Sequence, residues 1–141
     1  MVLYARDIVE RDFISLSPET SSLDAAKLMK EKHHGFVIVV SSDKPIGITT
    51  EWDFVSKIVA LEKDPATVML AEVMSHNVFT VKAADGIDYV SKLMAEKGIR
   101  RVLVLDGEKL LGVITSKTVL SRLEDYINSV SAQIARLNSP I

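Results

Sequence analysis

A threonine followed three residues later by an aspartate stands out among the residues of this chain that could do chemistry. Thr50 and Asp53 lie in the segment Gly47-Ile48-Thr49-Thr50-Glu51-Trp52-Asp53, where an apolar strand pattern ends and a helix pattern begins. This spacing predicts a capping box, in which each side chain accepts a hydrogen bond from the backbone N–H of the other residue. Because a capping box alone accounts for both residue types, the spacing by itself does not establish a binding site.

A matching segment, Gly112-Val113-Ile114-Thr115-Ser116-Lys117-Thr118, has a hydroxyl where the first segment has its carboxylate. It belongs to an internal repeat, since residues 5–60 align with residues 70–125 at a constant offset of 65 residues, without a gap and with 11 identical pairs. Two units related by such a repeat pack against each other, because neither buries its apolar face alone. We therefore expect any function to reside between the two copies.

Each copy shows the element order β-α-β-β-α, which predicts a mixed α/β (α+β) fold of two pseudo-symmetric units packed as one module. In the first copy a helix is expected after Ser17-Pro18-Glu19-Thr20, with Ala26, Leu28 and Met29 facing inward. In the second copy Ile87, Val90 and Met94 keep helical spacing. The remaining expected elements are short extended segments at 14–16 and 79–81, strands at 36–40 and 102–105, return strands at 45–49 and 110–114, and second helices that begin near residues 50 and 115.

The chain divides on this pattern into residues 5–62, residues 70–125 and a helical extension at 126–141. The linker Glu62-Lys63-Asp64-Pro65 separates the copies, because its charges and its proline interrupt both the helix pattern and the strand pattern.

The last helix continues past the second copy with an apolar stripe. Its members follow one another at steps of three and four residues, the spacing of a coiled-coil seam: Leu120, Leu123, Ile127, Val130, Ile134 and Leu137. One interpretation is an amphipathic helix packed on its own domain, and the other is a contact between subunits. We favour the subunit contact, because the core of the repeat is complete without this helix. A homodimer is expected, with the helices around Ile58 and Leu123 at the centre of its contact.

Composition excludes several classes of function. The chain has 141 residues, 48% of them hydrophobic, a mean hydropathy of +0.21 and a net charge of −2, which argues against a nucleic-acid partner. The chain has no run of about 18 apolar residues, which is the length needed to span a membrane. The first ten residues lack the apolar run of a signal peptide, so we expect a cytoplasmic protein.

Catalytic and metal-binding patterns are also missing. The sequence has no cysteine, no glycine-rich phosphate loop and no nucleophile elbow, and His33, His34 and His76 do not have the spacing of metal ligands. We therefore expect no catalytic residues, no metal and no cofactor.

The tandem units resemble a pair of cystathionine-β-synthase-type domains (CBS domains). The resemblance covers residue 5 to about residue 125 and rests on the order of elements, the Leu-Met pair late in each first helix, and the pattern Gly-apolar-x-Thr-x-x-Asp after the return strand. It implies a regulatory module without a catalytic domain, which binds an adenosine-containing ligand (AMP, ADP, ATP or S-adenosylmethionine) in clefts between the copies. It also implies that two such pairs associate through their helices, and that a regulated protein, which the sequence does not identify, responds to the ligand.

The resemblance assigns residues to two unequal clefts. In the first cleft, Thr50 and Asp53 hold the ribose with Ile48 and Thr49 beside them, Phe79 and Thr80 lie near the base, and Arg100, Arg101 and Lys117 neutralise phosphate. In the second cleft, the corresponding residues are Thr115 and Thr118 for ribose, Ile14 and Ser15 near the base, and Gly35 and Phe36 where the cations should be. The second cleft lacks the carboxylate and the cations, so we expect weaker binding there, with His33 and His34 compensating in part.

Two other interpretations stay open. The chain could be a purely structural or protein-interaction module with empty clefts, in which capping is the sole role of Thr50 and Asp53. It could also be an enzyme whose catalysis is assembled at the cleft. Titration with adenosine ligands separates a binding module from a scaffold, and a turnover assay on a bound ligand tests the enzyme.

Overall fold

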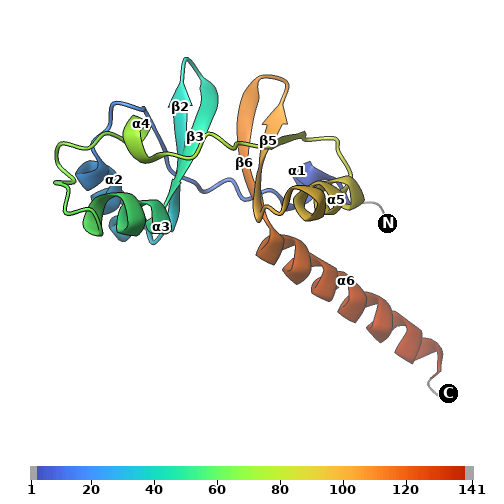
Figure 1. Cartoon of the computed structure of the whole chain (residues 1–141). Helices are drawn as coiled ribbons and strands as arrows, with labels where there is room; N and C mark the ends of the chain where they lie inside the picture. Colours follow the sequence, from blue (N-terminus) through green and yellow to red (C-terminus); the bar gives the residue numbers. More distant parts are fainter. Residues whose placement is uncertain (1–2, 139–141) are drawn as a thin grey trace.

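Two three-stranded sheets form the centre of the molecule in the computed structural model, which describes residues 3–138 (Figure 1). The first sheet contains β1 (Ser15–Leu16), β2 (Phe36–Ser41) and β3 (Lys44–Thr50), and the second contains β4 (Thr80–Lys82), β5 (Arg101–Asp106) and β6 (Lys109–Thr115). In each sheet the second strand lies in the middle; the first strand runs parallel to it and the third runs antiparallel to it. The predicted class, two β-α-β-β-α units with a C-terminal helix, is confirmed.

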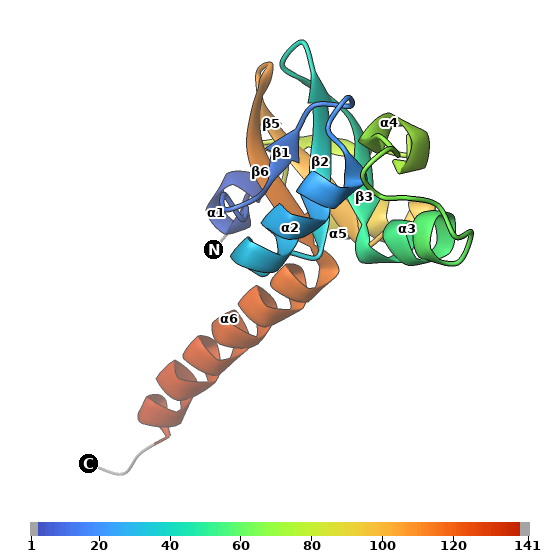
Figure 2. The same ribbon diagram turned by 90° about the vertical axis from the view of Figure 1, so that its left-hand side faces the viewer.

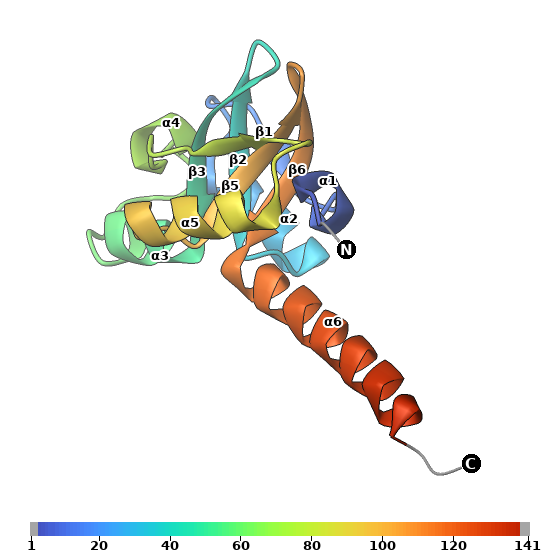
Figure 3. The same ribbon diagram turned by 90° about the vertical axis from the view of Figure 1, so that its right-hand side faces the viewer.

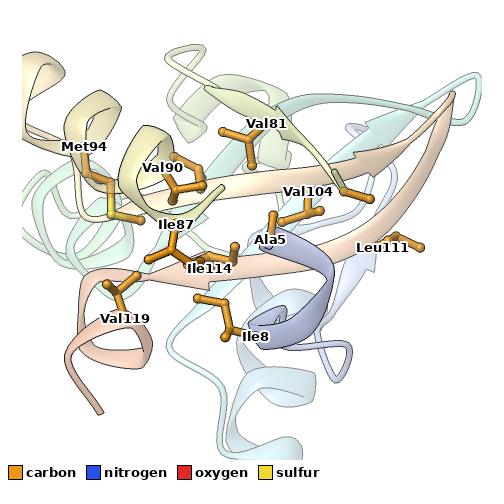
Figure 4. Packing of buried hydrophobic residues seen from close by; sticks show 12 residues of the cluster. Ala5, Ile8, Val81, Ile87, Val90, Met94, Val104, Leu111, Ile114 and Val119 are labelled. Atoms are coloured by element: carbon orange, nitrogen blue, oxygen red, sulfur yellow. The ribbon is translucent and has the colours of Figure 1, made fainter. Parts of the chain in front are cut away.

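The helices lie outside the sheets. Helix α2 (Ser22–Lys32) and helix α5 (Ile87–Lys97) each link the first and second strands of a unit, and α3 (Glu51–Phe54) with the π-helix η1 (Val55–Val59) follows the first return strand. The prediction for α5 is confirmed, because Ile87, Val90 and Met94 are buried in the core of the second unit (Figure 4). In α2 the buried residues are Ser22, Ala25 and Met29, whereas Ala26 is exposed. The prediction that Ala26 faces inward is therefore wrong by one position, a rotation of about 100° around the helix.

A third apolar cluster joins the two units. Ile38 of the first unit is fully buried beside Leu103 and Val113 of the second. Partly buried side chains from both units complete this cluster: Phe13, Phe36, Val40, Ile48, Val78 and Leu110. The two copies therefore share a core, as the repeat predicted.

The two units exchange a short helix. The helix that precedes the first strand of one unit packs into the core of the other unit. Helix α1 (Ala5–Ile8) precedes β1 but buries Ala5 and Ile8 in the core of the second unit (Figures 1 and 4). Helix α4 (Leu70–Val73) precedes β4 but buries Leu70 in the core of the first unit. Backbone hydrogen bonds fix both exchanges, with Ala5 N donating to Asp85 O at 2.8 Å and Leu70 N donating to Thr20 O at 2.9 Å. The segment repeated in the sequence therefore differs from the group of elements that share one core, because each core includes a helix from the other repeat.

The glycine that the two copies share marks the place where these segments cross the sheets. After α1, Glu10 pairs with Val113 of β6, and after α4, Ser75 pairs with Ile48 of β3. A Cβ atom at Gly112 would overlap the backbone oxygen of Glu10, and one at Gly47 would lie 2.5 Å from the sulfur of Met74. At Gly112 the backbone of Glu10 leaves no room for a side chain, and at Gly47 the Met74 side chain and the Ser75 carbonyl oxygen, at 3.0 Å, leave little.

Helix α6 (Ser116–Leu137) departs from the body of the molecule after its first turns (Figures 2 and 3). Val119 is buried, but the whole predicted stripe is exposed, from 38% at Leu123 to 80% at Leu137. The interpretation in which this helix packs on its own domain is therefore wrong for the described residues. Residues 139–141 of the predicted extension lie outside the described part. Within residues 3–138, no helix is long and apolar enough to cross a membrane.

The ends of α2 and α5 offer a test of local strain. Gly98 ends α5 in the left-handed conformation with φ +63°, and His33 ends α2 at the equivalent position with φ +57°. Since a side chain is disfavoured there, His33→Gly should raise the free energy of unfolding by about 0.5–1 kcal/mol, and Gly98→His should lower it by about 1–2 kcal/mol. Denaturant unfolding measures both. A less stable His33→Gly protein would show that the imidazole makes a stabilising contact.

Candidate functional site

The Thr50 cap forms as the sequence predicted. Thr50 is the N-cap of α3, and its hydroxyl accepts from the Asp53 backbone N–H at 3.4 Å, while the backbone N–H of Thr50 donates to Asp53 Oδ2 at 2.8 Å. The Thr50 hydroxyl also lies 3.2 Å from the same carboxylate oxygen, in donor geometry. The capping box is therefore complete in this structure.

The second carboxylate oxygen of Asp53 is held by a lysine. Lys57 Nζ lies 2.9 Å from Asp53 Oδ1 and donates to the backbone oxygen of Val73 at 2.8 Å. Lys57 lies one turn after Asp53, within η1, and Val73 ends α4. Asp53 is only 8% exposed. Both of its oxygens thus have partners within the protein, and the lysine ties the first unit to the segment that leads into the second.

Arg101 and Phe36 meet between the two units. They occupy equivalent positions at the start of β5 and β2, and the guanidinium carbon of Arg101 lies 5.0 Å from the centre of the Phe36 ring, a cation–π distance. Phe36 pairs with Thr50 across the first sheet, and Arg101 pairs with Thr115 across the second. Arg101 Nε is buried and, within residues 3–138, has no hydrogen-bond partner. This stacked pair therefore lies beside both helix starts.

The other residues assigned to the first cleft have mixed environments. Thr49 is fully buried, and its hydroxyl has no hydrogen-bond partner in the described part of the chain, whereas Ile48 belongs to the shared core. Phe79 is half-buried with Lys97 Nζ 6.0 Å from its ring centre, and Thr80 is exposed. Arg100 is exposed, and its carbonyl accepts the Ser116 N–H at 3.0 Å.

A cavity of about 390 Å³ lies at the second cleft. Its wall includes Phe36, Thr115 and Thr118, three of the six residues assigned to that cleft. The other three do not line it: Ile14 is buried in the core of the first unit, Ser15 is exposed on β1, and Gly35 accepts the Glu51 N–H through its carbonyl at 3.1 Å.

Lys117, which was assigned to the first cleft, also lines this cavity. The reason is local, because Lys117 follows the N-cap Thr115 by two residues and so projects from the same helix start as Thr118.

The cavity contains charges that sequence reasoning missed. The segment between α1 and β1 contributes two carboxylates, Glu10 and Asp12, together with Phe13. The second turn of α6 contributes the cation Arg122, together with Ser121. His34, which was expected to compensate in part, lines the wall with its Nε2 atom 3.5 Å from Asp12 Oδ2. Helical spacing could have found Arg122, four residues after Thr118. No sequence signal places Glu10, because its position depends on a pairing with a residue about a hundred positions away.

Together these features define a tandem-repeat α/β module with a cavity where the two repeats meet. The chain belongs to the CBS domain family, since residues 5–60 and 70–125 each match the CBS domain. It is 37% identical over 123 residues to an uncharacterized protein of Methanopyrus kandleri, an alignment that covers 86% of this chain and 62% of that protein. It is 32% identical over 125 residues to a homoserine O-acetyltransferase of Methanohalobium evestigatum, covering 87% of this chain but 24% of the enzyme. The chain thus spans less than two thirds of either relative.

Solved structures show the same architecture. A hexameric CBS-CP12 protein from bloom-forming cyanobacteria matches with a TM-score of 0.76 and 37% identity, over 85% of this chain and 67% of that one. The CBS domain pair of protein MJ0100, solved in complex with 5′-methylthioadenosine and S-adenosyl-L-methionine, matches with a TM-score of 0.73 and 28% identity. This alignment covers 89% of this chain and 98% of that one.

Proposed function

We propose that this chain is a regulatory module that binds an adenosine-containing ligand (AMP, ADP, ATP or S-adenosylmethionine) between its two CBS motifs. The cavity of about 390 Å³ carries the proposal, because that volume falls within the range of small-molecule sites and the cavity lies where the two repeats meet. The complex of the MJ0100 domain pair with two adenosine compounds supports the ligand class. Binding would stabilise one arrangement of the two units, which a regulated partner would recognise.

On this proposal the ligand binds in the cleft of Thr115, which lines the cavity, rather than in the cleft of Asp53. Lys117 and Arg122 offer positive charge to a phosphate, and the cavity wall also carries hydroxyl and carboxylate groups suited to a ribose. The Asp53 cleft, which the sequence favoured, keeps the residue types of an adenosine site. However, its carboxylate is already bound by Thr50 and Lys57. The experiment must therefore distinguish binding in the Thr115 cleft from binding in the Asp53 cleft.

Titration calorimetry with AMP, ADP, ATP and S-adenosylmethionine tests the proposal. Arg122→Ala and Lys117→Ala should each weaken nucleotide binding by about tenfold or more, the effect of removing a hydrogen bond to a charged group. Asp53→Ala should leave the affinity unchanged and lower the free energy of unfolding by about 1–3 kcal/mol, because it removes the cap and leaves Lys57 unpaired. Lys27→Ala on the exposed face of α2 is the matched control.

The opposite outcome assigns the other cleft. If Asp53→Ala weakens binding by about 10- to 150-fold while Arg122→Ala does not, the ligand occupies the first cleft. A ligand present at 100 times its dissociation constant should also stabilise the protein by about 2.7 kcal/mol in a thermal unfolding assay.

A second candidate is a scaffold whose clefts stay empty. The complete capping box favours it, since Thr50 and Asp53 already have a structural role. Failure of all four ligands to produce heat or thermal stabilisation would support the scaffold. A turnover assay on any ligand that binds tests for catalysis, which we do not expect.

We further propose that two chains associate through the exposed stripe of α6. The stripe has the three-four spacing of a coiled-coil seam and extends into solvent, so a second copy of the same helix is the matching surface. The relative from cyanobacteria is a hexamer, which shows association of a CBS protein of this fold. The proposed contact remains centred on the helices around Ile58 and Leu123, although Ile58 itself is 2% exposed within the core of its own unit. Its exposed neighbours Val55 and Val59 take its place in the proposed contact.

A further inference from the structure

Glu10 lines the cavity, and two backbone hydrogen bonds hold it in place. Its backbone N–H donates to Val113 O at 2.9 Å, and its carbonyl accepts the Val113 N–H at 3.0 Å. Because Val113 lies on β6 just before the helix start at Thr115, this pairing holds the Glu10 side chain beside that helix start. The exchange of α1 between the units is what brings the residue there.

The Glu10 carboxylate contacts the residue that replaces the family aspartate. Thr118 Oγ1 donates to Glu10 Oε1 at 3.2 Å, and Thr118 Oγ1 lies 3.0 Å from Thr115 Oγ1. A hydroxyl has one proton, so when Thr118 donates to Glu10, Thr115 must be the donor to Thr118. The Thr115 oxygen in turn accepts the Thr118 backbone N–H at 3.1 Å. These bonds form one directed chain that ends on the carboxylate.

At equivalent backbone positions, the two helix starts and their crossing segments carry the same two kinds of group in exchanged places. In the first cleft the carboxylate is on the helix, at Asp53, and a hydroxyl is on the crossing segment, at Ser75. In the second cleft the hydroxyl is on the helix, at Thr118, and the carboxylate is on the crossing segment, at Glu10. The positions correspond, because Ser75 pairs with Ile48 through two backbone hydrogen bonds of 3.0 and 2.8 Å, as Glu10 does with Val113.

We infer that Glu10 supplies the carboxylate that accepts hydrogen bonds from the vicinal hydroxyl groups of a ribose in the second cleft. The inference rests on the proposed function and adds a residue that the family motif does not contain. A carboxylate offers two oxygens to two neighbouring hydroxyls, and such charge-assisted bonds are stronger than neutral ones. Lys117 and Arg122 of α6 also line the cavity, so a ribose with an attached anionic group matches the charges present there.

Adenosine and 2′,3′-dideoxyadenosine are the probes that test this role, because they differ only in the two hydroxyl groups. The parent protein should bind adenosine about 10- to 150-fold more tightly than the dideoxy compound. Glu10→Gln keeps the shape of the side chain and should abolish most of that difference by weakening adenosine alone. Glu31→Gln on the exposed face of α2 is the matched control and should leave both affinities unchanged.

Thr118→Asp gives a second test, because it should change the affinity for adenosine in opposite directions in the parent protein and in the Glu10→Gln protein. In the parent protein a new carboxylate would face Glu10 at close range, and the repulsion should weaken adenosine binding. In the Glu10→Gln protein the same change should restore it, because one carboxylate is again present. The inference is overturned if adenosine binds but Glu10→Gln keeps the preference for hydroxyl groups, or if Thr118→Asp acts with the same sign in both backgrounds. Absence of binding by the parent protein would overturn the proposed function itself, and this inference with it.

Discussion

Replacing Ile127 and Ile134 together by glutamate is expected to dissociate the proposed dimer. The two residues are 59% and 51% exposed in the single chain, and a symmetric dimer through α6 would bury four such side chains. Full burial of such a side chain is worth about 1.5–3 kcal/mol, and about half of each remains to be buried, so dimerisation should weaken by about 3–6 kcal/mol, roughly 10²- to 10⁴-fold in the dissociation constant. Sedimentation equilibrium or light scattering over a range of concentrations measures the change.

The matched control places the same charges on the opposite face of the same helix. Ser129→Glu and Ala132→Glu together add two carboxylates without touching the stripe, and the dimer should persist. If the Ile127→Glu and Ile134→Glu protein associates as tightly as the parent, α6 is not the contact. If both double variants dissociate, added charge rather than lost burial is the cause.

Replacing Gly112 by alanine is expected to destabilise the protein by about 2–4 kcal/mol. The added Cβ would overlap the Glu10 carbonyl oxygen, and the Glu10 backbone cannot move away without breaking its two hydrogen bonds to Val113, one through its carbonyl and one through its N–H. Denaturant unfolding of the parent and the variant measures the loss. Because the crossing segment carries Glu10, we expect the same variant to weaken ligand binding at the second cleft.

Gly35→Ala is the control for this substitution. A Cβ atom there would lie 3.2 Å from Glu51 Oε1, the end of a flexible side chain, so the cost should stay below about 1 kcal/mol. Equal losses at both positions would mean that Gly112 matters only through the general entropy of glycine, and that the close crossing of the chain can relax.

The sequence predicted the fold well because the signals for it are local. Strand patterns, helix spacing and the N-caps at Thr50 and Thr115 all depend on residues a few positions apart. The internal repeat then predicted that the two units pack against each other. Even the error at Ala26 is local, a one-residue shift in the inward face of α2.

The candidate site was less accessible to prediction because it is built from distant segments. The family motif pointed to Thr115 and Thr118, which line the cavity, but not to Glu10, which reaches Thr118 through a strand pairing that neither segment encodes alone. Lys117 was assigned across the module, although it projects from the same helix start as Thr118. The clefts were ranked from the residues of one motif, whereas a cavity depends on everything that surrounds it.

The exchange of α1 and α4 makes the two repeats obligate partners. A break in the linker at residues 62–65 would leave one fragment with α1 and another with α4, and each fragment would carry the helix that completes the other's core. Neither repeat could then fold as an autonomous copy, although the sequence presents them as two interchangeable units. A gene that encoded a single repeat of this kind could yield a stable product only by pairing two chains, which would exchange the same helices between molecules.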